Sequence, residues 1–185
     1  MKIEPLDAMC VKITLTNAEL QQRGYDPGDL TKEGQALEEL MTEMLAEARK
    51  AGLLEEDCCT RILAQLYECR EGGCILYFTS VGRDLRFTRS PVVYRFARCE
   101  DMIEALLQLF QHHCHRVYKS SLYRYQNSFY VVVYSIAPSD PHVAAALLEY
   151  GEQFGKGEAC RAFLEEHGAK VIDSNAMDVI TYYLA

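Results

Sequence analysis

The same order of predicted elements occurs twice in this chain of 185 residues. In each half, a segment of alternating apolar and polar residues precedes a longer stretch whose apolar residues recur every three or four positions. Two further strand-like segments around a turn then follow. A period of two indicates a strand and a period near 3.6 an amphipathic helix. The repetition therefore predicts two small modules, each with its own antiparallel sheet and helix.

The first half predicts a βαββ module. Val11, Ile13 and Leu15 alternate with polar residues as in a strand, and Asn17 then stands where a helix N-cap is expected. The long helix that follows has an apolar stripe and a glutamate-rich opposite side. The predicted elements are a strand at 10–16, a short helix at 17–22, a turn at 24–29, a long helix at 31–51 and a hairpin of strands 61–69 and 74–81.

The second half predicts a βαββααβ(α) module, a split βαβ arrangement with helices on one face of an antiparallel sheet. Gly155 and Gly157 interrupt the helical pattern and separate two predicted helices. The chain is thus predicted to be α+β, with modules at 1–82 and 92–185 and a short linker at 83–91. The elements of the second half are strands at 92–97, 117–125, 129–136 and 169–172, and helices at 99–113, 142–154, 158–166 and 175–183.

Charge and hydropathy restrict the partners and the compartment. The formal net charge is −8, and residues 1–82 hold 8 Lys and Arg against 15 Asp and Glu. Phosphate binding needs a basic face, so nucleic acid is not predicted as a partner. The apolar runs fall far short of the ~20 residues that span a bilayer, and the first residues lack the apolar core of a signal peptide. We therefore expect a cytoplasmic protein whose eight cysteines are mostly reduced.

No motif for catalysis or cofactor binding stands out in the sequence. Residues 151–157 (GEQFGKG) have the glycines and lysine of a phosphate loop, but their spacing is too short and no Ser or Thr follows the lysine. The paired glutamates are sequence neighbours, which diverge on a helix and do not form a catalytic dyad. We predict that the protein is not an enzyme and binds no cofactor.

Two clusters have the side-chain chemistry of metal ligands. One is His112, His113, Cys114 and His115, which either bind zinc with help from elsewhere or end a helix, where imidazoles suit the helix dipole. The other comprises the cysteines at 58, 59, 69 and 74, of which the last two flank the predicted hairpin turn. They either form a disulfide or a zinc clip or serve as small apolar fillers. The spacing favours no metal site in either cluster.

Two sets of residues resemble the signatures of the MecA adaptor family. Residues 23–30 (RGYDPGDL) follow an early strand and a short helix and lead into a long acidic helix. Farther along, residues 148–152 (LEYGE), 164–172 (LEEHGAKVI) and 175–180 (NAMDVI) occur in the family's order. The resemblance covers nearly the whole chain. One departure is the linker, because many members have a longer acidic segment between the modules, whereas residues 83–91 are net positive.

The resemblance implies a negative regulator of genetic competence that works as an adaptor. It implies that the N-terminal module captures a substrate protein and that the C-terminal module binds the AAA+ unfoldase ClpC. It further implies that binding promotes assembly of the ClpC hexamer, which passes captured proteins to the protease ClpP. We predict that exposed acids and a tyrosine near the C-terminal signature contact the unfoldase, namely Glu149, Tyr150, Glu152, Glu165 and Glu166.

On the N-terminal side, Arg23, Tyr25 and Asp26 are the predicted substrate-binding residues. Turn formation is a sufficient structural explanation for the neighbouring Gly24 and Pro27. An alternative function also stays open at this point. A βαββαβ module often binds a small ligand between its helix and sheet, so the protein is alternatively a metabolite-binding regulatory domain with a concave, partly polar pocket.

Overall fold

The computed structural model describes residues 1–26, 28, 30, 34–54, 61–69, 72–81, 90–137 and 139–184. The chain divides into two compact units, Met1–Asp84 and Leu85–Ala185, and each is described by itself. Each unit contains one antiparallel sheet and helices that pack on it, so the predicted α+β class with two small modules is confirmed. The predicted linker at 83–91 lies largely outside the described residues and stays a prediction.

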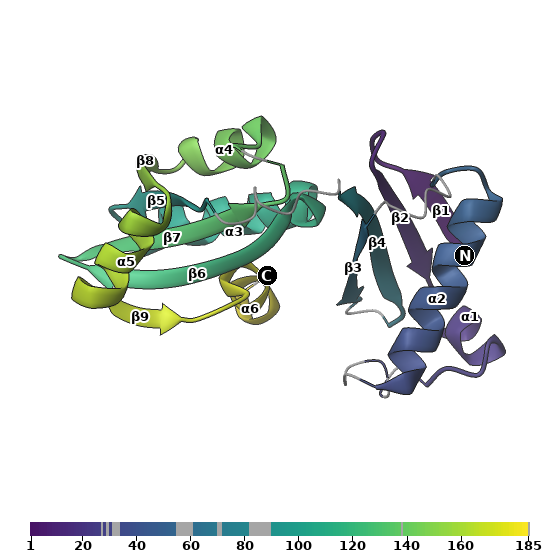
Figure 1. Ribbon diagram of the computed structural model, residues 1–185. Helices are drawn as coiled ribbons and strands as arrows, with labels where there is room; N and C mark the ends of the chain where they lie inside the picture. The colour runs from purple at the N-terminus through teal and green to yellow at the C-terminus, as the bar shows by residue number, and fades with distance from the viewer. Residues whose placement is uncertain are drawn as a thin grey trace. The chain divides into compact units, whose positions relative to one another are not determined.

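The N-terminal unit is a four-stranded sheet with a long helix across one face (Figure 1). The strand order is β1-β2-β4-β3, and every neighbouring pair is antiparallel. Leu40, Met44 and Ala48 of the long helix are buried against the sheet. The elements are β1 (Lys2–Pro5), β2 (Cys10–Leu15), α1 (Asn17–Gln22), α2 (Gln35–Lys50), β3 (Arg61–Glu68) and β4 (Cys74–Val81).

Strand β1 was not expected from the sequence. Its four residues pair with β2, with Ile3 opposite Ile13 and Pro5 opposite Val11. A segment this short carries too little alternation to indicate a strand, and the free edge of β2 supplies the pairing that forms it. Proline is tolerated at this position because β1 is itself an edge strand.

The N-cap of α1 is Thr16, so the prediction of Asn17 as the cap was wrong by one residue. The Thr16 hydroxyl accepts a hydrogen bond from the Glu19 amide at 3.4 Å, and the Glu19 carboxylate accepts one from the Thr16 amide at 2.8 Å. This reciprocal arrangement is a capping box. Asn17 instead ties α1 to the β3–β4 hairpin, because its Oδ1 accepts a hydrogen bond from the Gly73 amide at 2.6 Å.

The C-terminal unit is a five-stranded sheet in the order β8-β5-β7-β6-β9. Gln126 and Asn127 both have positive φ angles, 45° and 61°, so β6 and β7 are joined by a two-residue turn and not by the predicted three. The strands are β5 (Val92–Phe96), β6 (Val117–Tyr125), β7 (Ser128–Ser135), β8 (Glu152–Lys156) and β9 (Ala169–Ile172), and the helices are α3 (Cys99–His113), η3 (Cys114–Arg116), α4 (Pro141–Leu148), α5 (Glu158–His167) and α6 (Ala176–Leu184).

The predicted helix at 142–154 was wrong in its second half. Helix α4 ends at Leu148, and β8 pairs antiparallel with the edge of β5. Gly151 allows the chain to turn there, because a Cβ atom at this position would lie 2.6 Å from Phe96 Cε1 and 2.7 Å from the Arg95 carbonyl oxygen. Pairing with β5, a contact distant in sequence, therefore outweighs the local helical spacing.

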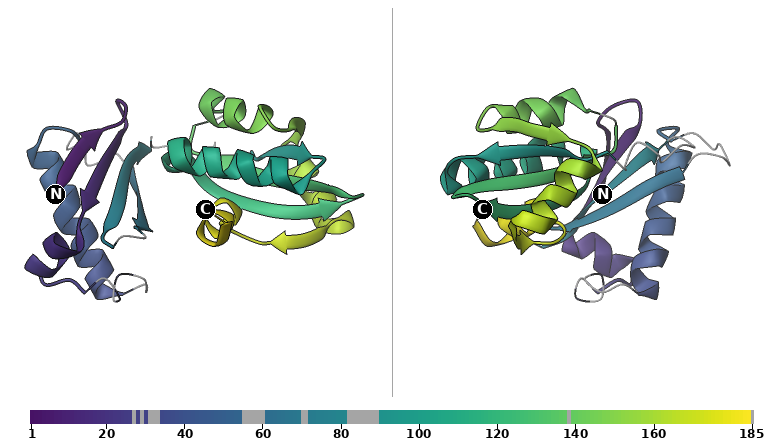
Figure 2. Two further views of the ribbon diagram at one scale, coloured as in Figure 1. Left: turned by 180° about the vertical axis from the view of Figure 1, so that it is seen from behind. Right: turned by 60° about the vertical axis from the view of Figure 1, so that its left-hand side comes forward.

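Helices cover both faces of this sheet, whereas the sequence predicted helices on one face. Leu164 of α5 is buried with Val93, Tyr130 and Val132. Because strand residues alternate between faces, Val131 faces the opposite side, where α3 packs. Helix α5 lies in front of the sheet in Figure 1, and α3 lies in front when the molecule is seen from behind in Figure 2. Within the described ranges, no helix is long and apolar enough to cross a bilayer.

Candidate partner-binding surfaces

The three residues predicted to contact substrate lie in the segment between α1 and α2. The Arg23 guanidinium forms an ion pair with Glu43 of α2, and the Tyr25 hydroxyl donates a hydrogen bond to the same carboxylate at 3.2 Å. Burial, followed by this hydrogen bond, raises the pKa of Tyr25. Asp26 Oδ1 accepts a hydrogen bond from the Gly28 amide at 3.0 Å. All three side chains thus hold the turn in place, and contact with a substrate stays a prediction.

Helix α2 presents an acidic face that these contacts only partly neutralise. Glu47 is paired with Lys50 at 2.9 Å, and this hydrogen bond lowers the pKa of the Glu47 carboxyl. Glu38 and Glu39 are exposed, and Glu39 accepts a hydrogen bond from the Gln35 side-chain amide at 2.6 Å. The exposed negative charge of the helix is therefore concentrated near its start.

The predicted unfoldase-binding residues lie on strand β8, on helix α5 and directly after helix α4. Glu152 lies on β8 and forms an ion pair with Arg95 at 2.8 Å. Glu165 forms one with Arg161 at 2.5 Å, within α5. Glu149 at the end of α4 is exposed, and the Glu166 side chain is 76% exposed. Two of the four acids are therefore paired with arginines, whereas Glu149 is exposed and Glu166 lies 3.9 Å from the imidazole of His167, a partner that is charged only when protonated.

Tyr150 differs from these acids because it is half-buried. Burial raises the pKa of its hydroxyl. The strand register places Glu152 and the start of β9 at the same end of the sheet. Arg95 of β5 pairs with Glu152 of β8 on one side and with Tyr130 of β7 on the other. Tyr123 is in turn opposite Tyr130 and Lys170. Glu152 and Lys170 thus lie at the same end of the sheet, on its two edge strands β8 and β9.

A row of aromatic rings connects these two edges on the face covered by α5. Ring centroids are 5.0 Å apart for Tyr130 and Phe154, 6.2 Å for Phe154 and Phe163, and 4.7 Å for Phe163 and His167. Phe154 is 41% exposed. This row was not predicted from the sequence, because Phe154 was expected to lie on a helix. Phe154 is the one large apolar residue of β8, so no local alternation indicates this strand, and its place follows from pairing with β5.

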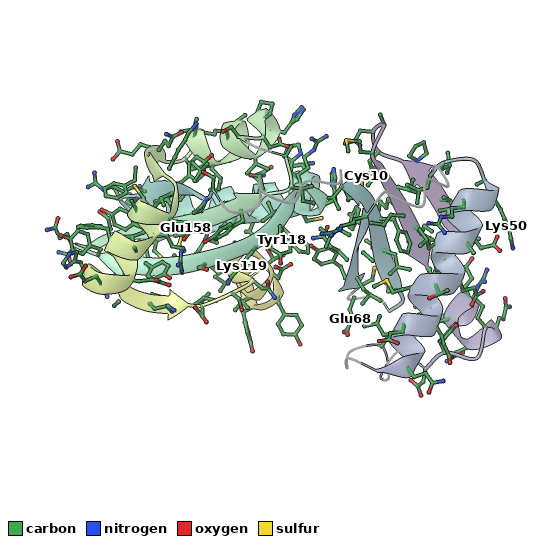
Figure 3. All side chains as sticks on the ribbon, in the orientation of Figure 1. Cys10, Lys50, Glu68, Tyr118, Lys119 and Glu158 are labelled. Carbon is green, nitrogen blue, oxygen red and sulfur yellow. The ribbon has the colours of Figure 1, made fainter. Side chains whose placement is uncertain are left out.

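The first turn of α5 is anchored to the sheet by a carboxylate (Figure 3). Glu158 accepts a hydrogen bond from the Tyr134 hydroxyl at 3.3 Å and one from Arg161 Nε at 2.6 Å. Burial, with a smaller effect of the Glu158 charge, raises the pKa of Tyr134 to about 12. These contacts hold the start of α5 against the sheet, which keeps Phe163 of this helix in place.

The residues of the two possible metal clusters do not converge. His112 is exposed, His113 stacks on His142 with ring centroids 5.5 Å apart, and His115 is buried. Among the residues that the structure describes, no three His, Cys, Asp or Glu side chains are grouped to hold a metal ion. Cys69 and Cys74 are thiols, and burial raises the pKa of Cys74 to about 11. Residues 58 and 59 lie outside the described residues.

The His113–His142 pair predicts a loss of stability in mild acid. Burial is the main cause that lowers the pKa of His113 below 6.5, and the charges of His142, Arg116 and His112 add to it, whereas Asp140 opposes it. The unfolded chain therefore takes up a proton first, so the free energy of unfolding should fall as pH drops from about 6.5 through the folded-state pKa. Urea unfolding between pH 7.5 and 5 measures this slope.

His113→Gln should flatten the pH dependence, and His112→Gln, at an exposed position, is the matched control. An equal slope in His113→Gln and the parent protein would show that His113 does not cause it.

The sequence model of a protein family described as negative regulator of genetic competence (MecA) matches residues 1–67 and 83–180. Among solved structures, the crystal structure of the C-terminal domain of YpbH is 25% identical, covers 50% of this chain and 96% of its own, and has a TM-score of 0.40. No curated protein matches the chain.

Proposed function

Because this chain belongs to the MecA family of negative regulators of genetic competence, we propose that it is a non-enzymatic adaptor between a captured protein and the AAA+ unfoldase ClpC. In this proposal the N-terminal module, residues 1–82, holds the substrate, and the C-terminal module, residues 92–185, binds ClpC. The observation that supports this proposal is that the family model matches residues in both compact units.

An adaptor works by raising local concentration. A protein held by one module meets an unfoldase held by the other at a millimolar effective concentration when the connection is short and spans the sites. Moderate affinity at each end is then sufficient. Promotion of ClpC hexamer assembly and transfer to ClpP belong to the same proposal. The cytoplasm is the proposed compartment, which fits the six described cysteines being thiols.

The described contacts favour Glu149 and Glu166 over the other candidate acids as the ClpC contacts. Both are exposed, whereas Glu152 and Glu165 are already paired with arginines. A charge that is already paired contributes less to a new interaction, because the existing ion pair has to be broken. A basic surface on ClpC is the complement that these two glutamates fit.

A charge-reversal experiment tests this assignment. The full chain should co-elute with ClpC and ATP in size-exclusion chromatography and raise the ClpC ATPase rate. The double variant Glu149→Lys/Glu166→Lys should bind ClpC about tenfold more weakly or worse, because like charges then face each other. The matched control, Glu38→Lys/Glu39→Lys on α2, makes the same change in the other unit and should bind as the parent does. Separate elution of the parent chain and ClpC would overturn the adaptor proposal.

The small-ligand alternative has less support. The cavity at the end of the N-terminal sheet has a volume of about 210 Å³, smaller than the roughly 300–1,000 Å³ of small-molecule sites. A second hollow on α2 has a volume of about 500 Å³, but it is shallow and is lined by polar side chains such as Glu39 and Thr42, unlike the mostly apolar pockets that bind small molecules. A rise in melting temperature with a metabolite would favour the alternative.

A further inference from the structure

Strand β3 forms an open edge of the N-terminal sheet. Among the described strands its one neighbour is β4, and its eight residues make it twice as long as the opposite edge strand β1. An edge strand leaves a row of backbone N–H and C=O groups unpaired, and such a row can take up an added strand.

The register of β3 shows which backbone groups point outward. The Cys69 amide donates to the Gly73 carbonyl at 3.1 Å, so this pair is of the hydrogen-bonded kind. Pairs alternate along an antiparallel ladder, and the next pair, Glu68 with Cys74, is therefore not hydrogen-bonded. Ala64, Leu66 and Glu68 thus direct their N–H and C=O groups away from β4. Their side chains share one face of the sheet.

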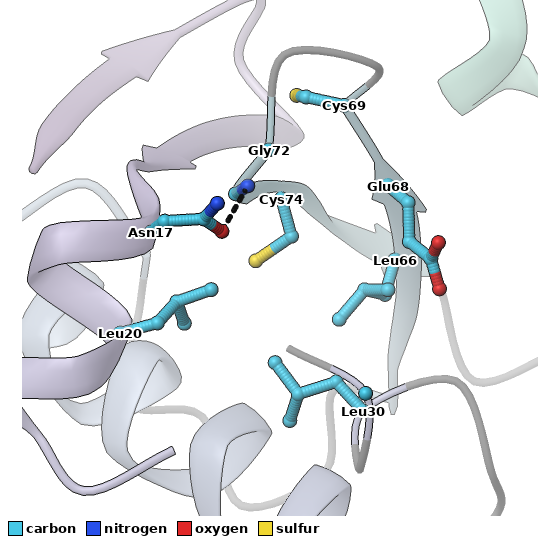
Figure 4. Close-up of a pocket in the computed structure, with 10 residues that line it drawn as sticks. Asn17, Leu20, Leu30, Leu66, Glu68, Cys69, Gly72 and Cys74 are labelled. Atoms are coloured by element: carbon cyan, nitrogen blue, oxygen red, sulfur yellow. Dashed lines mark hydrogen bonds between the residues drawn. The ribbon is translucent and has the colours of Figure 1, made fainter. Parts of the chain in front are cut away.

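A cavity lies at the end of this edge, on the same face (Figure 4). It has a volume of about 210 Å³ and is lined mainly by apolar groups, including Leu20, Leu30, Leu66 and Cys74. The Cys74 thiol points into it, and burial, which raises the pKa of Cys74 to about 11, keeps this thiol uncharged. The cavity has room for one aliphatic or aromatic side chain.

The charge of Glu68 at the rim of the cavity adds a second requirement for a segment that binds to this edge. Glu68 lines the cavity but is exposed, and its carboxylate points away from the cavity. In an added strand, the residue opposite Glu68 is two positions from the residue opposite Leu66, and both lie on one face. A lysine or arginine opposite Glu68 complements its charge, as it does the net negative charge of residues 1–82.

We propose that an extended segment of a captured protein adds to β3 as a fifth strand, with an apolar side chain in the cavity and a basic residue beside Glu68. All pairs in this sheet are antiparallel, so the added strand is antiparallel as well. The basic residue then comes two positions before the apolar one. This inference rests on the proposed function and names the substrate feature that the N-terminal module recognises.

The test uses the full chain and a fluorescein-labelled peptide of nine residues. The peptide alternates serine and threonine, except for one leucine and a lysine two positions before it, and binding is followed by fluorescence polarisation. Replacing the leucine by serine should weaken binding about tenfold or more, because a buried leucine side chain is lost. Replacing the lysine by glutamate should weaken it about threefold, the scale of an exposed ion pair. The reversed order, leucine before lysine, should bind more weakly than the original.

Two variants of the chain locate the site. Glu68→Lys should reverse the preference, so that the glutamate peptide binds better than the lysine peptide, whereas Glu38→Lys should not. Ala64→Pro removes an outward N–H without breaking a bond to β4, and it should abolish binding while urea unfolding stays cooperative. Equal binding of the leucine and serine peptides, no reversal in Glu68→Lys, or preference for the reversed peptide would overturn the proposal.

Co-elution of the same preparations with ClpC separates the two proposals. If ClpC binds but the peptides do not discriminate, the strand-addition proposal fails and the adaptor proposal stands. If the parent chain does not bind ClpC, the adaptor proposal fails whatever the peptides do.

Discussion

Gly73→Ala should destabilise the N-terminal unit and leave the stability of the C-terminal unit unchanged. Gly73 has a φ angle of 90°, a conformation that costs an L-residue about 1–2 kcal/mol. An added Cβ would also lie 2.2 Å from the Leu15 carbonyl oxygen, which is backbone and cannot rotate away. The overpacking adds about 1–3 kcal/mol, so the free energy of unfolding should fall by about 2–5 kcal/mol in total.

The matched control is Gly24→Ala in the same unit. Gly24 has a similar φ angle of 85°, but no atom lies within 4 Å of the added Cβ, so this variant should show the backbone cost alone. Urea unfolding followed by circular dichroism measures both, and the C-terminal unit should contribute an unchanged transition. Equal losses for the two variants would mean that the contact with Leu15 costs nothing.

Asp140→Ala should destabilise the C-terminal unit by about 2–4 kcal/mol. The carboxylate is only 3% exposed and accepts hydrogen bonds from the His142 and Val143 amides at 2.9 and 3.3 Å, which caps α4. It also pairs with Arg116 at 3.1 Å. Loss of a cap costs about 1 kcal/mol, and loss of the ion pair between the buried Asp140 carboxylate and the half-buried Arg116 guanidinium adds to this cost.

Asp140→Asn separates the two contributions, because asparagine caps a helix as well as aspartate does but carries no charge. We expect its urea midpoint to lie between those of the parent and Asp140→Ala. If Asp140→Asn is as unstable as Asp140→Ala, the ion pair with Arg116 accounts for the whole effect and the cap for none.

Local periodicity predicted the helices and strands that have one apolar and one polar side. The helix at 99–113 and the strand at 117–125 were placed at the observed bounds, because their apolar residues repeat with a clear period. Strands β1 and β8 were missed for one reason: both are short edge strands that exist through pairing with β2 and β5. A partner distant in sequence leaves no local periodic signal.

The candidate surfaces were predictable only in part. The sequence identified exposed acids such as Glu166. It did not predict the ion pair between Glu152 and Arg95, because this pair depends on the register of a strand that was expected to be a helix. Likewise, the cavity beside β3 combines residues from α1, the following segment and the hairpin, so its lining could not be read from any single segment. The sequence could therefore predict which residue types are exposed and charged. It could not predict which side chains lie next to them, because that depends on how the strands are paired.

The ladder between β2 and β4 also determines when the protein can fold during synthesis. Cys10 and Thr79, which lie on these strands and share a hydrogen bond, are separated by 69 positions. The N-terminal unit therefore cannot close its sheet until nearly all of it has left the ribosome, although its first strand emerges at the outset. The β6–β7 hairpin of the C-terminal unit pairs across two residues and has no such delay. A chain interrupted before β4 would expose the apolar side of β2, a signal that quality-control proteases can act on.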